Sequence, residues 1–333
     1  MACRKPTYRV DFVSQHGHRE QFHTSSEILR ADAYHDNSRP HEVSSSALET
    51  YGDPAAPNVV RIGNGGLGPT GLLRALCETY LEERDLWERL RIEWVCNHSR
   101  HTQVALQAGV VDIGLTYERA EEDRAELEGW STTIDMLCHD HFVLVGPRDD
   151  PAAVTSRLHV AGGFDAIATR RAPFHTRGDG SATMHKEHQL WTSARVTDDQ
   201  RDEGSWYQRV PGTPMEALDN ANKHNAYLLT DRATYIVAKQ RGLADGLAVF
   251  FEGGDVLLNS CAIVVRSDED RDPVCKLVAW LREPDAQEII ATYGEEWDIG
   301  LPLVTPSHQR EVDQSSLLRT YKQSEVVWKG ARL

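Results

Sequence analysis

A strand–turn–helix alternation beginning at residue 59 constrains the fold of this chain more than any other feature. Residues 59–62 are an apolar run typical of a buried strand, and a glycine-rich turn at 63–68 leads into leucines at helical spacing. Further strand patterns at 91–96 and 111–115 enclose a short helical pattern at 102–107. This βαβαβ order predicts the opening of an open parallel α/β sheet.

A second alternating block follows a turn-rich segment at residues 146–151. Residues 162–170 predict a helix, and residues 173–187 predict a strand end, a tight turn and another helix. Two such blocks within 333 residues predict two lobes that face one ligand cleft, because open α/β sheets bind ligands at the carboxyl ends of their strands. We expect 58–145 with 259–305 to form the first lobe and 147–257 to form the second.

The flanking segments differ from this body. Residues 1–57 are polar and rich in His and Ser, and they predict a flexible N-terminal arm. Its histidines have no cysteine or carboxylate partners at ligand spacing, so we expect no metal there. Residues 306–333 predict a C-terminal strap.

Charge and composition exclude several partners. The net charge of −15 argues against a nucleic-acid surface, which needs a basic stripe. No run of about 18 apolar residues exists to span a membrane. The first residues lack the apolar core of a signal peptide, and the six cysteines are scattered. We therefore expect a cytoplasmic protein without a transporter partner.

Residues 173–187 carry the strongest binding signal. Arg177 offers a planar fork of donors, and Ser181 and Thr183 add hydroxyls where a helix begins and leaves N–H groups unpaired. Together these groups would form a cradle for an anion. The alternative interpretation is an ordinary turn with a hydroxyl N-cap and a surface arginine.

The glycine turn matches the pattern Gly63-x-Gly65-x-x-Gly68 of dinucleotide-binding folds. That interpretation also needs a ribose partner about 20 residues further on, and Arg100 lies well beyond that distance. We therefore expect no nicotinamide and no other cofactor.

Four segments occur in an order that resembles tungstate-binding-type periplasmic solute-binding proteins: 140–152, 173–187, 227–235 and 284–293. The resemblance implies a type II solute-binding fold of two α/β lobes with an oxyanion held between them. Residues 177–185 are similar to the family motif Arg-Gly-Asp-x-Ser-x-Thr-His, with Met184 as one extra residue. Arg232 lies in a Thr-Asp-Arg motif, and Ser99 lies where the family has a Gly-Thr-Gly loop.

One departure from the family bears on the ligand. The family's first loop is a Thr/Ser run, whereas residues 63–66 here read Gly-Asn-Gly-Gly. Backbone N–H groups of such a loop still bind anions, but the loss of side chains predicts a roomier site. We therefore expect an organic anion with a carboxylate or phosphate head to bind better than tungstate, molybdate or sulfate.

The sequence predicts two alternative functions, one as a binding protein and one as an enzyme. The first is an intracellular protein that binds a small anion in the interlobe cleft. The second is an enzyme on the same scaffold, in which His98 and His101 do acid–base chemistry on a small organic acid. The predicted ligand-binding residues are Asn64, Gly65, Gly66, Ser99, Arg100, Arg177, Ser181, Thr183 and Arg232.

Overall fold

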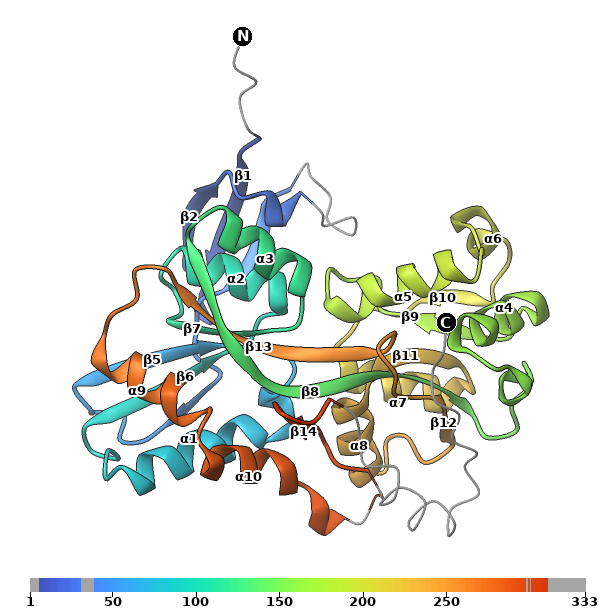
Figure 1. The fold of residues 1–333 in the computed structure, drawn as a ribbon. Helices are drawn as coiled ribbons and strands as arrows, with labels where there is room; N and C mark the ends of the chain where they lie inside the picture. The colour runs from blue at the N-terminus through green and yellow to red at the C-terminus, as the bar shows by residue number, and fades with distance from the viewer. Residues whose placement is uncertain (1–5, 31–38, 298, 300, 311–333) are drawn as a thin grey trace. The chain divides into compact units, whose positions relative to one another are not determined.

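A computed structural model describes residues 6–30, 39–297, 299 and 301–310 (Figure 1). The described residues divide into two compact units. Unit 1 takes its residues from 1–137 and 261–289, and unit 2 takes its residues from 138–260 and 290–333. Within the described part of the chain, no helix is long and apolar enough to cross a bilayer.

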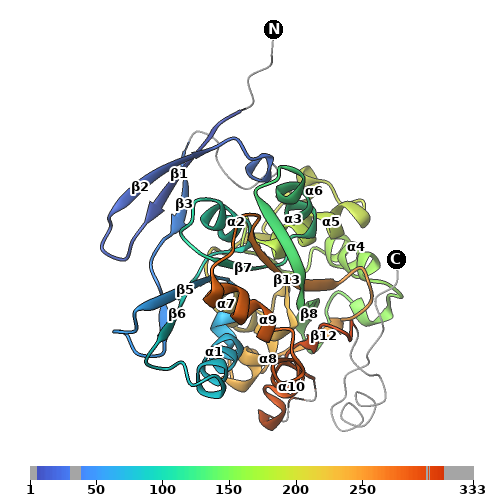
Figure 2. The same cartoon turned by 60° about the vertical axis from the view of Figure 1, so that its left-hand side comes forward.

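Unit 1 begins with a three-stranded sheet in the order β2-β1-β3 (Figure 2). Strand β1 pairs antiparallel with β2 and parallel with β3. The strands are β1 (Tyr8–Val13), β2 (Arg19–Thr24) and β3 (His41–Ser44), with a 3₁₀ turn at Glu27–Leu29.

The prediction of a flexible arm over 1–57 is wrong for its described residues. Few apolar side chains occur there, but those present share a core with helix α2 and neighbouring strands of unit 1. Val10, Phe12, Ile28, Leu29 and Val43 are each at most 3 % exposed. Their burial offsets the cost of ordering the segment, because each large apolar side chain contributes roughly 1.5–3 kcal/mol.

The main sheet of unit 1 carries the first predicted alternation. Its strands run in the order β4-β6-β5-β7-β13, with β5 parallel to β6 and β7 and with β13 antiparallel to β7. The elements are β4 (Glu49–Tyr51), β5 (Asn58–Gly63), α1 (Leu72–Glu83), β6 (Leu90–Val95), α2 (Ser99–Gln107), β7 (Ile113–Thr116), α3 (Arg119–Leu127), β13 (Leu258–Arg266), α9 (Asp272–Trp280) and α10 (Pro284–Thr292).

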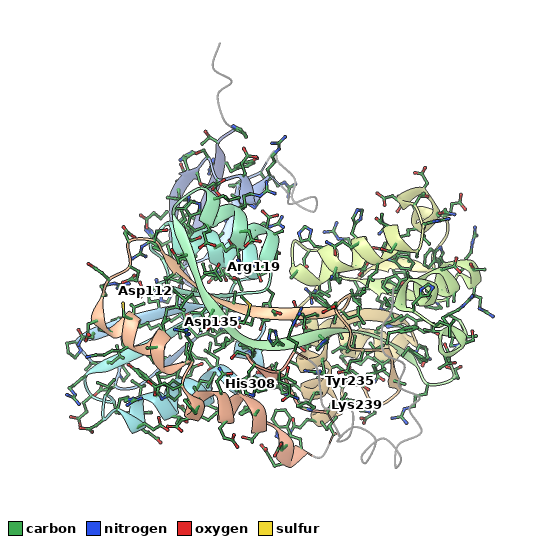
Figure 3. The ribbon with its side chains drawn as sticks, in the orientation of Figure 1. Asp112, Arg119, Asp135, Tyr235, Lys239 and His308 are labelled. Carbon is green, nitrogen blue, oxygen red and sulfur yellow. The ribbon has the colours of Figure 1, made fainter. Side chains whose placement is uncertain are left out.

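Asp112, labelled in Figure 3, connects three segments of this unit. One carboxylate oxygen accepts from the Arg61 backbone N–H at 2.8 Å, and the other accepts from the Arg271 side chain at 2.5 Å. These bonds hold strand β5 to the segments that precede β7 and α9.

Unit 2 carries the second alternation. Its sheet has the order β8-β11-β9-β10, with β9 parallel to β10 and β11, while β12 and β14 also pair with β8. The elements are β8 (Ser131–Pro147), α4 (Val160–Arg170), β9 (Phe174–Thr176), α5 (Ala182–Ser193), α6 (Asp198–Asp202), β10 (Tyr207–Arg209), α7 (Pro214–His224), β11 (Tyr227–Asp231), α8 (Arg232–Gln240), β12 (Leu247–Phe251) and β14 (Thr305–Pro306).

An aromatic core holds helix α5 on this sheet. The Trp191 ring of α5 meets Phe174 of β9 edge-on at a centroid distance of 5.0 Å and meets Phe164 of α4 at 4.5 Å. Such pairs add about 0.5–1.5 kcal/mol beyond their burial. The start of α5 is therefore fixed relative to the end of β9.

The unit boundaries differ from the predicted lobes. The sequence predicts 138–145 in the first lobe, whereas these residues belong to unit 2, and unit 1 ends at 289 rather than 305. The difference arises because β8 is one strand of 17 residues that passes from one unit into the other, with no breaker between its halves. Most of the predicted strap at 306–333 lies outside the described residues.

Candidate functional site

The turn after β9 builds the predicted anion cradle of unit 2. Strand β9 ends at Thr176, Gly178 adopts a positive φ of 62°, and Ser181 is the N-cap of α5. The turn therefore brings Arg177 back over the first turn of the helix. The arrangement is a strand-to-helix turn, as the sequence predicts.

The guanidinium of Arg177 is the centre of this turn and is only 5 % exposed. Its Nε donates to Asp179 Oδ2 at 2.9 Å, and its Nη2 donates to Ser181 Oγ at 2.5 Å. No described residue accepts from Nη1. The fork is thus held rigidly by one edge while two N–H donors remain for a ligand.

Asp179 is the counter-ion of this arginine. Burial opposes its ionisation, but the Arg177 guanidinium and the hydrogen bonds from Ser181 keep its pKa below its usual range. Its Oδ1 also accepts from the Ser181 backbone N–H at 3.0 Å. The carboxylate therefore stays charged and shapes the turn.

The first turn of α5 keeps donors available. The Ser181 hydroxyl makes no capping bond to the helix, and no described residue bonds to the Thr183 hydroxyl, whose residue is 6 % exposed. Uncapped N–H groups at a helix start carry a partial positive charge and favour an anion. Arg177, Ser181 and Thr183 thus lie together on one helix start.

Met184, the extra residue in the motif, also has a place in this turn. Its sulfur accepts from the Thr176 hydroxyl at 3.1 Å and from the Gly178 N–H at 3.2 Å. The methionine is fully buried and joins the end of β9 to the turn. Sequence reasoning missed this role because sulfur is a weak acceptor with no typical position in such motifs.

Arg232 does not lie at this turn. Its side chain is fully buried at the start of α8, where Nη1 donates to Glu252 Oε1 at 2.9 Å and Nε donates to the Leu303 carbonyl at 3.4 Å. Asp140 lies 3.9 Å away, and burial raises its pKa well above the usual value. The structure places Arg232 in a buried ion-pair network rather than at a solvent-facing site.

The turn after β5 in unit 1 is braced by Asn64, which is fully buried. The Asn64 side chain donates to the Leu115 carbonyl at 2.8 Å and accepts from the Gly68 N–H at 3.1 Å. Its backbone carbonyl accepts from the Trp94 indole at 2.7 Å. The side chain predicted as a ligand donor is thus engaged in holding the loop.

Gly65 and Gly66 are required by close neighbours rather than by open space. A Cβ at Gly65 would lie 2.7 Å from the Asn97 carbonyl oxygen, and one at Gly66 would lie 2.8 Å from the Tyr117 hydroxyl. Real Cβ atoms do not approach so closely. The predicted roomier site over this loop is wrong, because the Tyr117 ring occupies that space.

Ser99 and Arg100 begin helix α2 but face different partners. The Ser99 hydroxyl accepts from the Tyr117 N–H at 3.0 Å, which places it beside the residue that covers Gly66. Arg100 is 3 % exposed and pairs with Glu118 at 2.8 Å and with Glu121 at 3.9 Å. Arg100 is therefore engaged by carboxylates of its own unit.

His98 and His101, the predicted catalytic pair, do come together. Their ring centroids are 3.8 Å apart, and the ring of His41 from β3 meets His101 edge-on at 5.6 Å. Among the residues that the structure describes, no group of His, Cys, Asp or Glu is arranged to hold a metal ion. His41 was not predicted, because it comes from the segment expected to be a flexible arm.

Comparison with known proteins decides the family. The model of the PBP superfamily domain matches residues 75–274, which is more than half of the chain. This chain belongs to the PBP superfamily. The predicted type II periplasmic-binding-protein fold and the resemblance to tungstate-binding proteins are both confirmed.

Individual members of the superfamily share this likeness. A tungstate-binding protein TupA of Peptoclostridium acidaminophilum is 29% identical over 207 residues, which cover 60% of this chain and 69% of that protein. A Haloferax volcanii protein, provisionally assigned as an ABC transporter anion-binding protein, is 27% identical over 67% of this chain. The chain spans 65% of that relative's length.

Solved structures agree with the sequences. The tungstate-binding protein TupA from Desulfovibrio alaskensis G20 has a TM-score of 0.63 and 25% identity, covering 75% of this chain and 98% of that one. The tungstate ABC transporter structure from Geobacter sulfurreducens has a TM-score of 0.61 and 27% identity, covering 72% and 100%.

Glu187 is a further residue of this PBP-superfamily chain that sequence reasoning missed. It lies one helical turn after Thr183 on α5, and its Oε1 accepts from the Tyr207 hydroxyl at 2.8 Å and from the Trp191 indole at 3.2 Å. Burial raises the pKa of Glu187 to about 7. The helix that carries the cradle therefore holds a carboxyl that titrates near neutral pH.

Proposed function

We propose that this chain binds a small oxyanion, with tungstate as the first candidate, and that Arg177 is its charge anchor. The observation that carries the proposal is the nearly buried Arg177 fork, held by Asp179 with Nη1 left over, beside a helix start whose N-cap makes no capping bond. A rigid, desolvated fork recognises an anion better than a mobile surface arginine. Ser181 and Thr183 supply the neighbouring hydroxyls.

Within unit 1, we propose that the loop at residues 64–66 also offers donors to an anion. The Asn64 side chain bonds to the Leu115 carbonyl and to the Gly68 N–H, so the donors that we propose in the loop itself are the Gly65 and Gly66 N–H groups. Tyr117 brings a hydroxyl to Gly66, and Ser99 lies beside the Tyr117 amide. A phenol next to the glycine loop provides an O–H donor where the loop itself has none.

This arrangement favours a compact oxyanion over the larger organic anion expected from the sequence. The organic anion needed open space over Gly65 and Gly66, and Asn97 and Tyr117 occupy that space. The names of the relatives, two of which are tungstate-binding proteins, support the same ligand class.

Titration calorimetry with tungstate, molybdate, sulfate, phosphate and a small dicarboxylate tests the proposal. We expect tungstate or molybdate to bind at least tenfold more tightly than the dicarboxylate, a difference of about 1.4 kcal/mol. Tight binding of the dicarboxylate with no heat from any tetrahedral oxyanion would contradict it.

The enzyme alternative is supported by one observation, the close but tilted rings of His98 and His101. Two imidazoles at this distance are suited to passing a proton between ligand and solvent. Mass spectrometry of the natively purified protein before and after incubation decides this point. A co-purified organic acid that is converted by the wild type but not by His98→Ala would favour the enzyme.

Transport and location are separate proposals. The relatives named as parts of ABC transporters argue against the expectation that this chain has no transporter partner, and we do not retain that expectation. A cytoplasmic location remains a prediction from the N-terminal sequence, and fractionation of cells that express the full-length gene is its test.

A further inference from the structure

We propose that Asn97 couples the N-terminal sheet to the candidate anion-binding loop of unit 1, so that β3 positions the start of helix α2. The N-terminal sheet lies outside residues 75–274, the range matched by the PBP superfamily model. Nothing in the family match therefore assigns it a role. This inference rests on the proposed function only in the part of its test that measures ligand affinity.

The coupling consists of a two-way hydrogen bond between a side chain and a strand. The Asn97 side chain accepts from the Ser44 N–H at 2.9 Å and donates to the Ser44 carbonyl at 2.9 Å. Asn97 is 7 % exposed, so these bonds face little competition from water. An amide that satisfies both groups of one backbone residue extends the strand pattern of β3 into the loop.

The same residue contacts the glycine loop through its backbone. The Asn97 carbonyl is the atom that excludes a Cβ at Gly65, and it also accepts from the Thr102 hydroxyl at 3.1 Å. The next residues along the chain are the N-cap His98 and then Ser99. A shift of Asn97 would therefore move the glycine loop and the Ser99 hydroxyl together.

A second contact runs in parallel. His41, at the start of β3, is 2 % exposed and meets the ring of His101 edge-on, and the ring of His101 lies 3.8 Å from that of His98. The start of β3 thus contacts the first turn of α2, and its end contacts the residue before the N-cap. The sheet itself is anchored by the apolar core that Val43 and Phe12 share with Val104 and Leu106 of α2.

The chain offers a matched control on the same sheet. The Thr24 hydroxyl of β2 donates to Gln107 Oε1 at 2.7 Å, at the opposite end of α2. Thr24→Val keeps the side-chain shape and loosens the sheet from the far end of the helix. Asn97→Ala loosens it at the end that carries Ser99.

The test measures tungstate affinity by calorimetry and thermal stability for both variants. We expect Asn97→Ala to lose about tenfold in affinity, because a misplaced donor no longer makes a well-aligned hydrogen bond to the ligand. Thr24→Val should lose thermal stability and keep its affinity within about twofold. Unchanged affinity in Asn97→Ala, or an equal loss in both variants, would overturn the proposal.

A further variant and a hydrogen-exchange measurement distinguish a positioning role of Asn97 from a general loss of stability. Ser44→Pro removes the partner N–H from the other side, so its effect on affinity should not add to that of Asn97→Ala. Hydrogen exchange should quicken at residues 97–102 in Asn97→Ala but not in Thr24→Val. If the wild type binds no oxyanion, the proposed function fails, and the exchange result alone then decides whether Asn97 positions α2.

Discussion

Two strand-to-helix turns of this protein, one after β9 and one after β5, differ in which atoms they leave available. In the turn after β9, the side chains bond to one another, as Arg177 does with Asp179 and Ser181. In the turn after β5, the Asn64 side chain bonds to the backbone, and no described residue accepts from the Gly65 and Gly66 N–H groups. The first turn is built to present side chains, and the second is built to present backbone.

This difference predicts different consequences of mutation. Loss of a side chain in the turn after β9 should remove binding and spare the fold. Loss of a side chain near the turn after β5 should damage the fold first, because those side chains support the backbone.

Arg177→Ala should abolish oxyanion binding, with a loss of about 2–5 kcal/mol in tungstate affinity. Arg177→Lys should recover little, because a point charge does not reproduce a planar fork. Arg171→Ala is the control, since Arg171 forms an exposed ion pair with Glu203 in the same unit. If Arg177→Ala binds tungstate with normal affinity in calorimetry, Arg177 does not bind the ligand, and the proposed difference between the two turns is contradicted.

Arg100→Ala should act on stability. Its removal leaves Glu118 and Glu121 without their buried cation, and breaking such a pair costs about 3 kcal/mol. We expect denaturant unfolding to show this loss while tungstate affinity of the folded protein changes by less than about fivefold. A selective loss of affinity with full stability would place Arg100 at the ligand after all.

Glu187→Gln tests whether the helix that carries the cradle responds to pH. The pKa of Glu187 is raised from 4.5 to about 7 by burial, so the stability that its protonated form contributes is full below about pH 4.5. That contribution is lost as the pH rises through about 7, by up to about 3 kcal/mol. The glutamine variant should be the more stable protein at pH 8, and thermal unfolding across pH 5–8 should show a flatter profile for it.

Tyr117→Phe is the finest test of the turn after β5. If its hydroxyl assists the backbone N–H groups at Gly66, tungstate affinity should fall about fivefold, the value of one neutral hydrogen bond. The phenylalanine ring keeps the packing, so the melting temperature should hold. If tungstate affinity is unchanged, the Tyr117 hydroxyl does not assist binding, and only backbone N–H groups of the loop remain as proposed donors.

The sequence predicts local features well where neighbours in sequence are also neighbours in space. The turn over 177–183 is one case, because a strand end, a glycine and an N-cap serine determine it locally. The fold class and family followed from the order of several such segments. Each of these signals lies within a short stretch of chain.

Partners that come from elsewhere in the chain explain the failures. The charges that engage Arg100 and Arg232 come from Glu118 and Glu252, about 20 residues away in each case, and no local pattern reveals them. The N-terminal segment was interpreted as a flexible arm because its few apolar residues cannot form a core alone. They are buried only because α2 supplies the rest.

Asp179 competes with a bound anion for the guanidinium of Arg177. Tethered two residues from Arg177, its carboxylate acts as a built-in competitor at high effective concentration for the same guanidinium edge. An anion bound through Nη1 leaves this pair intact, whereas an anion that also takes the edge formed by Nε and Nη2 must displace the Asp179 carboxylate, which weakens its binding.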